Sequence, residues 1–196
     1  SLFIMVNKTD TAKADTKEVL SIVDLPVNYS CGIETNGNMF YISDINTSKI
    51  YLIDSVGNIH DSFSTLAEHP WGLALGDSCI WQSSCVDNMI YKIDINTKEI
   101  VDSFNGPGSH PHGLTYDGEF LWIADYDTGL IYKIDPDTGS EIDSISLSIN
   151  YLQGLAWDGK NLWVVESGTV IDTIHKIDPD RKKIMTSITS PDTVTA

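Results

Sequence analysis

The sequence predicts an all-β fold, a β-propeller built from four-stranded blades of about 41 residues, because several residue types recur in register along the chain. A set of unrelated hairpins in a sandwich would not explain a fixed period, whereas four short strands every forty-odd residues are typical of a propeller blade. The recurring residues are the glycines Gly32, Gly72, Gly113 and Gly154, the aromatic residues Phe40, Trp81, Trp122 and Trp163, and the aspartates Asp54, Asp94, Asp135 and Asp178.

Each copy contains four runs of alternating apolar and polar residues separated by turn residues, which indicates four antiparallel strands, A to D. Strand A is the Gly-Leu-Ala/Thr run, as at residues 154–157, and the Asp-Gly pairs at 117–118 and 158–159 form tight turns after it. Strand B carries a Leu-Trp pair, strand C reads Ile-Tyr-Lys-Ile-Asp and leads into a turn at 136–139, and strand D resembles residues 100–104.

The chain does not encode a whole number of blades. We expect one propeller domain over 1–196, divided into an outer half-blade (1–24), four complete blades (25–64, 65–105, 106–147 and 148–190) and the start of another (191–196). The half-blade contributes strands at 2–7 and 18–22. An unclosed propeller leaves sheet edges and an apolar blade face uncovered, so the chain is either part of a longer protein or closes its ring with a second copy. We favour self-association, as a dimer or by completion of a blade in trans.

The charge of the chain restricts the classes of molecule that it is expected to bind. The 196 residues carry 12 Lys and Arg against 28 Asp and Glu, a net charge of -16, which would repel nucleic acid and anionic lipid. Because of this charge we expect no nucleic-acid binding. No apolar run reaches the roughly 18 to 20 residues of a membrane helix, so we also expect no membrane insertion. Cations, small molecules or proteins with a basic face are the favourable partners.

The recurring aromatic residues are best interpreted as core side chains that fill the wedge between neighbouring sheets. Tyr51, Tyr91, Tyr132 and His175 share another repeat position. His175 is therefore interpreted as a substitute for tyrosine rather than as a ligand.

The connections from D to A and from B to C vary between copies, as a binding face on a constant scaffold would. In propellers these connections surround one mouth of the central channel. The position before the strand A glycine and the position three residues after the mid-blade aromatic residue lie there. They are occupied by Cys31, Trp71, His112 and Gln153, and by Ser43, Ser84, Asp125 and Glu166. We predict ligand contacts from Cys31, Trp71, His110, His112, Gln153 and Ser84.

Imidazole and carboxylate groups converge in the third and fourth blades. His112, Asp125 and Glu166, with His110 nearby, could hold a divalent metal or supply an acid/base pair. The alternative is that His-Pro is a favourable entry into strand A, because it also occurs at residues 69–70. Cys31 and Cys85 could form a disulfide or could be small buried residues. No Gly-x-Ser-x-Gly, Cys-x-x-Cys, Walker or dinucleotide-binding motif occurs.

The phrases at 111–118, 121–125 and 131–139 resemble the NHL/YVTN/SMP-30-like propeller superfamily, and are closest to repeats of glutamine cyclotransferase-like and virginiamycin B lyase-like proteins. The resemblance covers residues 28–190 and rests on scaffold residues. It implies rings of five to seven blades and, for the lyases, a divalent metal on channel-mouth His and Glu, of which His112 and Glu166 are positional analogues. It also favours an extracellular or cell-surface location over the cytoplasm.

Three functions follow as hypotheses. The favoured one is a non-catalytic module that binds a protein or a small ligand on the variable face, since no complete catalytic constellation is present. The second is a metal-assisted lyase, lactonase or cyclotransferase working through His112, Asp125 and Glu166. The third is a structural piece of a larger surface propeller.

Overall fold

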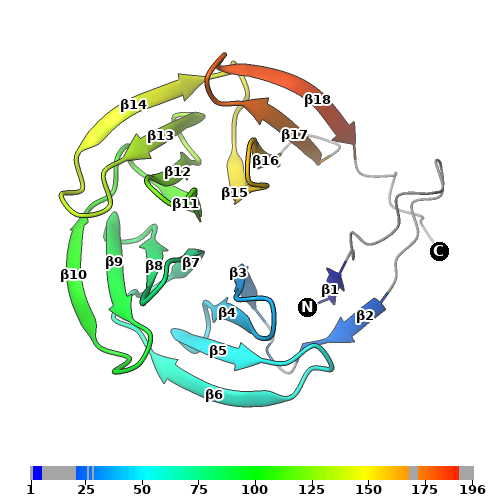
Figure 1. Cartoon of the computed structure of the whole chain (residues 1–196), viewed down its shortest axis with the longest axis vertical. Coiled ribbons are helices and arrows are strands. Elements are labelled where there is room, and N and C mark those ends of the chain that lie inside the picture. Colours follow the sequence, from blue (N-terminus) through cyan, green and yellow to red (C-terminus); the bar gives the residue numbers. More distant parts are fainter. Residues whose placement is uncertain (1, 6–20, 26, 28, 168–171, 190–196) are drawn as a thin grey trace.

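The computed structural model describes residues 2–5, 21–25, 27, 29–167 and 172–189, and it confirms the predicted propeller. Four four-stranded antiparallel sheets stand in a ring, and within each sheet the strands follow chain order from the centre outward (Figure 1). The first two blades consist of β3 (Ser30–Thr35), β4 (Phe40–Asp44), β5 (Lys49–Ile53) and β6 (Ile59–Ser64), and of β7 (Pro70–Leu75), β8 (Cys79–Ser84), β9 (Met89–Asp94) and β10 (Ile100–Asn105). The next two consist of β11 (Pro111–Tyr116), β12 (Leu121–Asp125), β13 (Leu130–Ile134) and β14 (Glu141–Ser146), and of β15 (Leu152–Trp157), β16 (Leu162–Glu166), β17 (Thr173–Asp178) and β18 (Lys183–Thr189).

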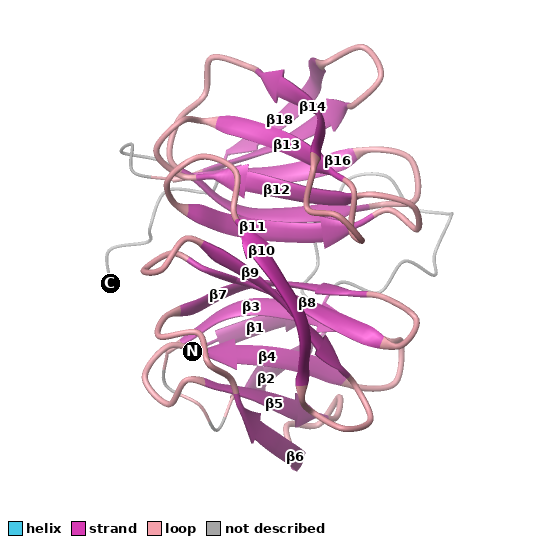
Figure 2. Cartoon of the chain, turned by 90° about the vertical axis from the view of Figure 1, so that its left-hand side faces the viewer, coloured by secondary structure: helices cyan, strands magenta, loops and turns pink. Residues whose placement is uncertain are grey.

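The predicted half-blade is a two-stranded antiparallel sheet of β1 (Leu2–Met5) and β2 (Ser21–Asp24). It lies between the first and fourth blades, at the fifth position of the ring (Figure 1). Every regular element of the described chain is a strand (Figure 2). Among these residues there is no helix long and apolar enough to cross a membrane.

The turns between the first two strands of the blades match the prediction where an Asp-Gly pair is present. Gly118 and Gly159 have φ angles of 101° and 90°, which glycine adopts without the steric cost of a Cβ. Asp117 and Asp158 close these turns by donating their backbone N–H to Phe120 and Asn161, both at 3.1 Å.

One predicted register is wrong by one residue. Trp122 lies opposite Thr115 on the inner strand of its blade, and the equivalent partner of Glu34 in the first blade is Tyr41. Tyr41 is buried, whereas Phe40 is half-buried, so Tyr41 is the mid-blade core residue. The prediction failed because the glycine interval between the first two blades is one residue shorter. The missing residue falls in the turn between β5 and β6, since Asp54 and Ile59 are five residues apart whereas Asp94 and Ile100 are six residues apart. Counting from Phe40 therefore also chose Ser43 where Asp44 is the equivalent of Asp125.

The core lies between blades, because one face of each sheet packs against the next sheet. Between the third and fourth blades, Trp122, Ile131 and Ile145 pack against Leu152 and Leu155. Similar apolar clusters fill the two preceding interfaces.

On the corresponding face of the fourth blade, an apolar pair is exposed among the residues that the structure describes. Ile174 and Ile188 form a cross-strand pair with exposed fractions of 41% and 38%, whereas the equivalent pair in the third blade, Ile131 and Ile145, is 0% and 1% exposed. In the first two blades the equivalent inner members, Ile50 and Ile90, are also 0% exposed, while their partners Phe63 and Phe104 are half-buried. The exposed pair of the fourth blade therefore marks a surface suited to a further partner.

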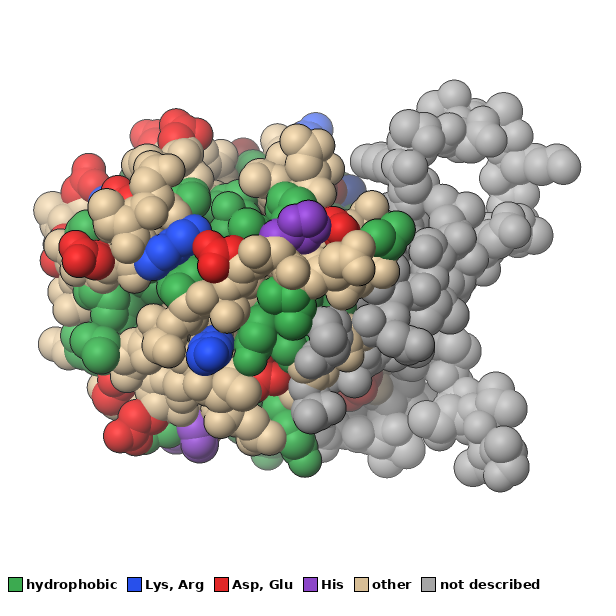
Figure 3. Space-filling view, turned by 90° about the horizontal axis from the view of Figure 1, so that it is seen from below, with side chains coloured by type: hydrophobic (Ala, Val, Ile, Leu, Met, Phe, Trp, Pro, Cys, Tyr) green, Lys and Arg blue, Asp and Glu red, His purple; other side chains and the backbone are tan. Residues whose placement is uncertain are grey.

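Acidic side chains are scattered over the side of the molecule shown in Figure 3, among few lysines or arginines. Several of them form hydrogen bonds to the backbone of turns. Asp94 accepts the N–H groups of Asn96 and Thr97 at 2.8 Å, and Asp135 does the same for its own turn. The excess negative charge is therefore used partly to build turns and marks no single patch here.

Candidate functional site

The two kinds of variable connection lie together at one mouth of the channel. Backbone hydrogen bonds join them in three blades, from Ile45 to Tyr29, from Tyr126 to His110 and from Ser167 to Tyr151, at 2.9 to 3.1 Å. The inner strands start at this mouth, so the residues that precede and open each inner strand line it.

Four rings from three blades contact one another in sequence along this mouth. Trp71 lies 4.4 Å from His112, His112 lies 4.8 Å from Tyr126, and Tyr126 lies 5.2 Å from Tyr151, measured between ring centroids. The planes are tilted by 30°, 32° and 50°, within the offset and tilted arrangements that aromatic pairs favour. We call Trp71, His112, Tyr126 and Tyr151 the aromatic ladder. The sequence predicted the first two members and missed the two tyrosines, although both lie in the connections it assigned to this face.

Tyr151 ends the aromatic ladder in an unusual backbone conformation. Its φ is 56°, in the left-handed region that a bulky residue rarely adopts, and its side chain is 44% exposed. Such strain costs about 1 to 3 kcal/mol and concentrates at functional positions. An exposed tyrosine held in this way is well placed to contact a ligand.

His112 is buried inside the aromatic ladder. Burial lowers its pKa from 6.5 to about 4, and a hydrogen bond with Gln153 opposes this shift only in part. Its Nδ1 is buried without a hydrogen-bond partner among the described residues. At neutral pH the ring is therefore uncharged and serves as an aromatic contact.

Asp125 is a structural residue in this arrangement. Its side chain is fully buried, and its two oxygens accept hydrogen bonds from the N–H groups of Ser109 and His110 and from the N–H and hydroxyl of Thr128, at 2.7 to 2.9 Å. Asp44 accepts three of the equivalent bonds in the first blade, from the N–H of Tyr29 and from the N–H and hydroxyl of Thr47. A carboxylate with four donors holds the two connections together and has little capacity left for a metal ion.

Glu166 is also committed to the protein. One oxygen contacts His175 Nε2 at 3.0 Å and the other accepts the Asn150 N–H at 3.2 Å, while His175 Nδ1 contacts the Ser187 hydroxyl at 2.8 Å. Tyr91 reaches Asp87 in a comparable way, at 2.6 Å, in the second blade. His175 therefore takes the place of a tyrosine that bonds to the neighbouring connection.

No three His, Cys, Asp or Glu side chains of the described chain are arranged so that they could hold a metal ion. His112, Asp125 and Glu166 therefore do not form the joint metal site that the sequence suggested. The structure brings His112 to Gln153 and the ring residues, and it commits the two carboxylates elsewhere.

The remaining candidates have separate surroundings. His110 is exposed and its Nδ1 contacts Asp127, whose pKa that hydrogen bond lowers. Ser84 is fully buried and its hydroxyl lacks a partner among the described residues. Cys31 is exposed and Cys85 is half-buried, and both are free thiols, so the structure contains no disulfide between them. Although Cys31 is exposed as a residue, partial desolvation of its thiol, followed by the charge of Asp44, raises the pKa of this group to about 11, which keeps it a thiol.

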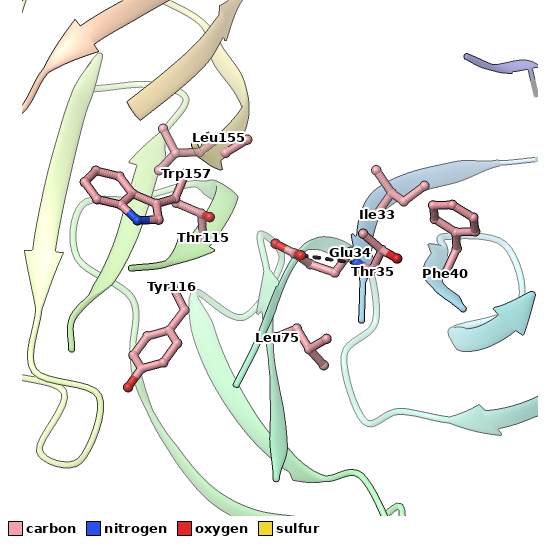
Figure 4. A pocket seen from close by; sticks show the side chains of 10 residues that line it. Ile33, Glu34, Thr35, Phe40, Leu75, Thr115, Tyr116, Leu155 and Trp157 are labelled. Carbon is pink, nitrogen blue, oxygen red and sulfur yellow. Dashed lines mark hydrogen bonds between the residues drawn. The ribbon is translucent and has the colours of Figure 1, made fainter. Parts of the chain in front are cut away.

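A cavity of about 270 Å³ opens at the opposite mouth, where the inner strands end (Figure 4). Its lining combines apolar and polar surface, and Glu34 of β3 lies among the lining residues. Glu34 was not among the residues predicted from the sequence, although Gly32-Ile33-Glu34 departs from the Gly-Leu-Ala/Thr pattern of the other inner strands. The full lining is Ile33, Glu34, Thr35, Phe40, Leu75, Thr115, Tyr116, Leu155, Ala156 and Trp157.

Comparisons with known proteins agree on the fold. No family model matches the chain, and no curated protein matches it in sequence. Among solved structures, glutaminyl cyclase from Myxococcus xanthus superposes with a TM-score of 0.70 at 13% identity, over 82% of this chain and 70% of that chain. Hydrazine synthase from Kuenenia stuttgartiensis superposes with a TM-score of 0.63 at 17% identity, over 85% of this chain and 50% of that chain. Virginiamycin B lyase from Staphylococcus aureus superposes with a TM-score of 0.60 at 21% identity, over 91% of this chain and 62% of that chain.

The class of protein is therefore a β-propeller. In particular, its propeller is structurally similar to those of glutaminyl cyclase and virginiamycin B lyase, the two kinds of protein that its repeats resemble. At these identities the likeness shows the fold and carries no activity across.

Proposed function

We propose that the protein is a non-catalytic binding module that holds a small ligand or a protein segment on the aromatic ladder. The observation that carries this proposal is the line of four stacked rings from three blades, ending in the exposed and strained Tyr151. Tyrosine and tryptophan provide large, rigid contact areas and dominate the energetics of many binding surfaces.

The chemistry of this mouth favours binding over catalysis. The carboxylates of Asp125 and Glu166 are occupied by protein donors, and His112 stays neutral at physiological pH. The partner expected here is a neutral or cationic ring, because the chain's net charge of -16 disfavours anions. An enzymatic role and an extracellular location stay predictions.

Saturation-transfer NMR with neutral ring fragments, indole and a methyl glycoside, tests the proposal. Tyr151→Ala should weaken fragment binding by at least tenfold, because it removes the exposed end of the ladder. Tyr29→Ala is the matched control, since Tyr29 holds the equivalent place in the first blade and is 59% exposed but lies outside the aromatic ladder. Equal effects of the two substitutions, or no saturation transfer to any fragment, would contradict the proposal.

We also propose that a second copy of the chain covers the open face of the fourth blade. The exposed Ile174–Ile188 pair and the two-stranded sheet at the fifth position support this proposal, because an added blade would bury the pair as the Ile131–Ile145 pair is buried in the third blade. The alternative, a structural piece of a larger propeller, would use the same face.

Light scattering at several protein concentrations tests this second proposal. Ile188→Lys should convert a concentration-dependent dimer into a monomer, whereas Ile142→Lys, at a 53% exposed isoleucine on the outer strand of the third blade, should not. A wild-type protein that stays monomeric at micromolar concentration would refute self-association.

A further inference from the structure

We infer that the cavity at the opposite mouth is a second binding site, separate from the aromatic ladder, that accepts a compact organic ammonium ion on the carboxylate of Glu34. The inference goes beyond the proposed function, because it concerns other residues at the other end of the channel.

The cavity is built from the last residues of the four inner strands. Leu75, Leu155 and Ile33 give it apolar walls, and Tyr116 and Trp157 add aromatic side chains. Figure 4 shows Glu34 projecting from β3 into the space between β3 and β11. At about 270 Å³ the cavity lies just below the range of about 300 to 1,000 Å³ that is usual for drug-sized ligands, so its occupant is small.

The charge of Glu34 is uncompensated within the described chain. None of the described ion pairs involves Glu34, and its only hydrogen bond there is a long one, 3.3 Å, from the N–H of Thr35. Burial raises the pKa of Glu34 to about 7, as is expected of a carboxyl among apolar walls. A cation brought into the cavity would restore the interactions that this carboxylate lost on leaving water.

The scaffold has no need of a carboxylate at this position. Ala74, Thr115 and Ala156 occupy the same register in the other three blades, two residues after the inner-strand glycine. Their small side chains leave the space that Glu34 enters. A charged residue that three equivalent positions do without is more simply explained by a ligand than by packing.

The surroundings select the kind of cation. One carboxylate with neighbouring threonine hydroxyls offers too few oxygen ligands for Ca²⁺ or Mg²⁺, which take about six or more. Aromatic faces and apolar walls suit the methyl groups of an alkylated ammonium ion, which gains from cation–π attraction and pays little for dehydration.

Isothermal titration calorimetry with choline tests the inference, using 3,3-dimethylbutan-1-ol as the uncharged molecule of the same shape. At pH 8 and low salt, choline should bind at least tenfold more tightly than the alcohol. Glu34→Gln should abolish this difference. Glu34→Ala provides a second variant that the scaffold tolerates, because alanine stands at this register in two other blades. Circular dichroism confirms that each variant is folded.

Two further variants separate the sites. Glu119→Gln removes an exposed carboxylate in the turn after β11 and should leave choline binding unchanged, as should Tyr151→Ala. Equal affinities for choline and the alcohol, or choline binding that survives Glu34→Ala, would overturn the inference. Choline binding that Tyr151→Ala removes would overturn it too, by assigning the cation to the aromatic ladder, and it would leave the proposed function standing.

Discussion

The Ser43 hydroxyl joins two blades by donating a hydrogen bond to the carbonyl of Trp71, 2.8 Å away on the next inner strand. The same hydroxyl accepts the Gly32 N–H of its own blade, also at 2.8 Å. Ser83 repeats the arrangement between Gly72 and His112 with the same distances. The first three blades are therefore linked at the channel by polar as well as apolar contacts.

Ser83→Ala should lower the free energy of unfolding by about 1 to 3 kcal/mol, because it leaves a buried N–H and a buried carbonyl without their partner. Urea unfolding measures this loss. Ser103→Ala, at an exposed position on β10, is the control and should change stability by less than about 0.5 kcal/mol. Similar effects of the two substitutions would show that the hydrogen bonds of the Ser83 hydroxyl contribute nothing to stability.

The recurring inner-strand glycines should differ in their tolerance of alanine. A Cβ on Gly72 would overlap the His112 carbonyl, whereas a Cβ on Gly154 would meet its nearest neighbour, Val165, at an ordinary 3.6 Å. Gly72→Ala should therefore destabilise by about 1 to 3 kcal/mol, through forced separation of two blades. Gly154→Ala should be neutral or stabilise by about 0.4 to 1 kcal/mol. Thermal unfolding of both variants gives the comparison, and an equal loss at the two sites would refute it.

The corrected register of the first blade can be tested by truncation. Tyr41→Ala should cost about 3 to 5 kcal/mol, as should Trp122→Ala, because each leaves a cavity between blades. Phe40→Ala should cost less, since Phe40 is only half-buried. Chemical denaturation ranks the three, and a larger loss at Phe40 than at Tyr41 would restore the original register.

Glu34 should make the protein less stable as the pH rises. Its pKa is raised from 4.5 to about 7 by burial, so between these values the unfolded chain releases a proton that the folded chain keeps. Stability lost through this group therefore accumulates from about pH 4.5 to about pH 7. The difference in unfolding free energy between Glu34→Gln and wild type should grow across this window. A difference that is constant with pH would contradict the burial of this carboxyl.

His112 should act in the opposite direction. Its pKa is lowered from 6.5 to about 4, so the unfolded chain binds a proton before the folded chain does, and stability falls as the pH drops from about 6.5 to about 4. His112→Gln should remove this dependence. Denaturant titrations of both proteins at several pH values provide the test, and parallel curves would show that His112 is not buried.

The fold was predictable because the recurring residues answer packing requirements that every blade shares. Gly32, Gly72 and Gly113 allow close approach of neighbouring strands. Trp81 and Trp122 are buried and fill the space between sheets. The register of Tyr41 was missed because spacing was counted from Trp81 across an interval that is one residue shorter. The glycine of the same blade gives the correct position.

The candidate site was less predictable, because its chemistry depends on contacts that residue types do not reveal. The sequence gives no sign that the Asp125 carboxylate is engaged. In the structure it accepts hydrogen bonds from the backbone N–H groups of Ser109 and His110, which lie 16 and 15 residues earlier in the chain. The stacking of Tyr126 on Tyr151 joins two blades and has no local pattern. Glu34 was visible as a departure from the strand pattern, but only the convergence of four inner strands shows that it enters a cavity.

The open face of the fourth blade also implies a gradient along the chain. Each blade is stabilised mainly by its immediate neighbours, so a blade with one well-packed neighbour opens at a lower free energy than a blade between two. Backbone amides of β17 and β18 should then exchange with solvent sooner than those of β12 and β13. Local opening would then begin at the fourth blade, and a partner bound to its exposed face would slow amide exchange in β17 and β18.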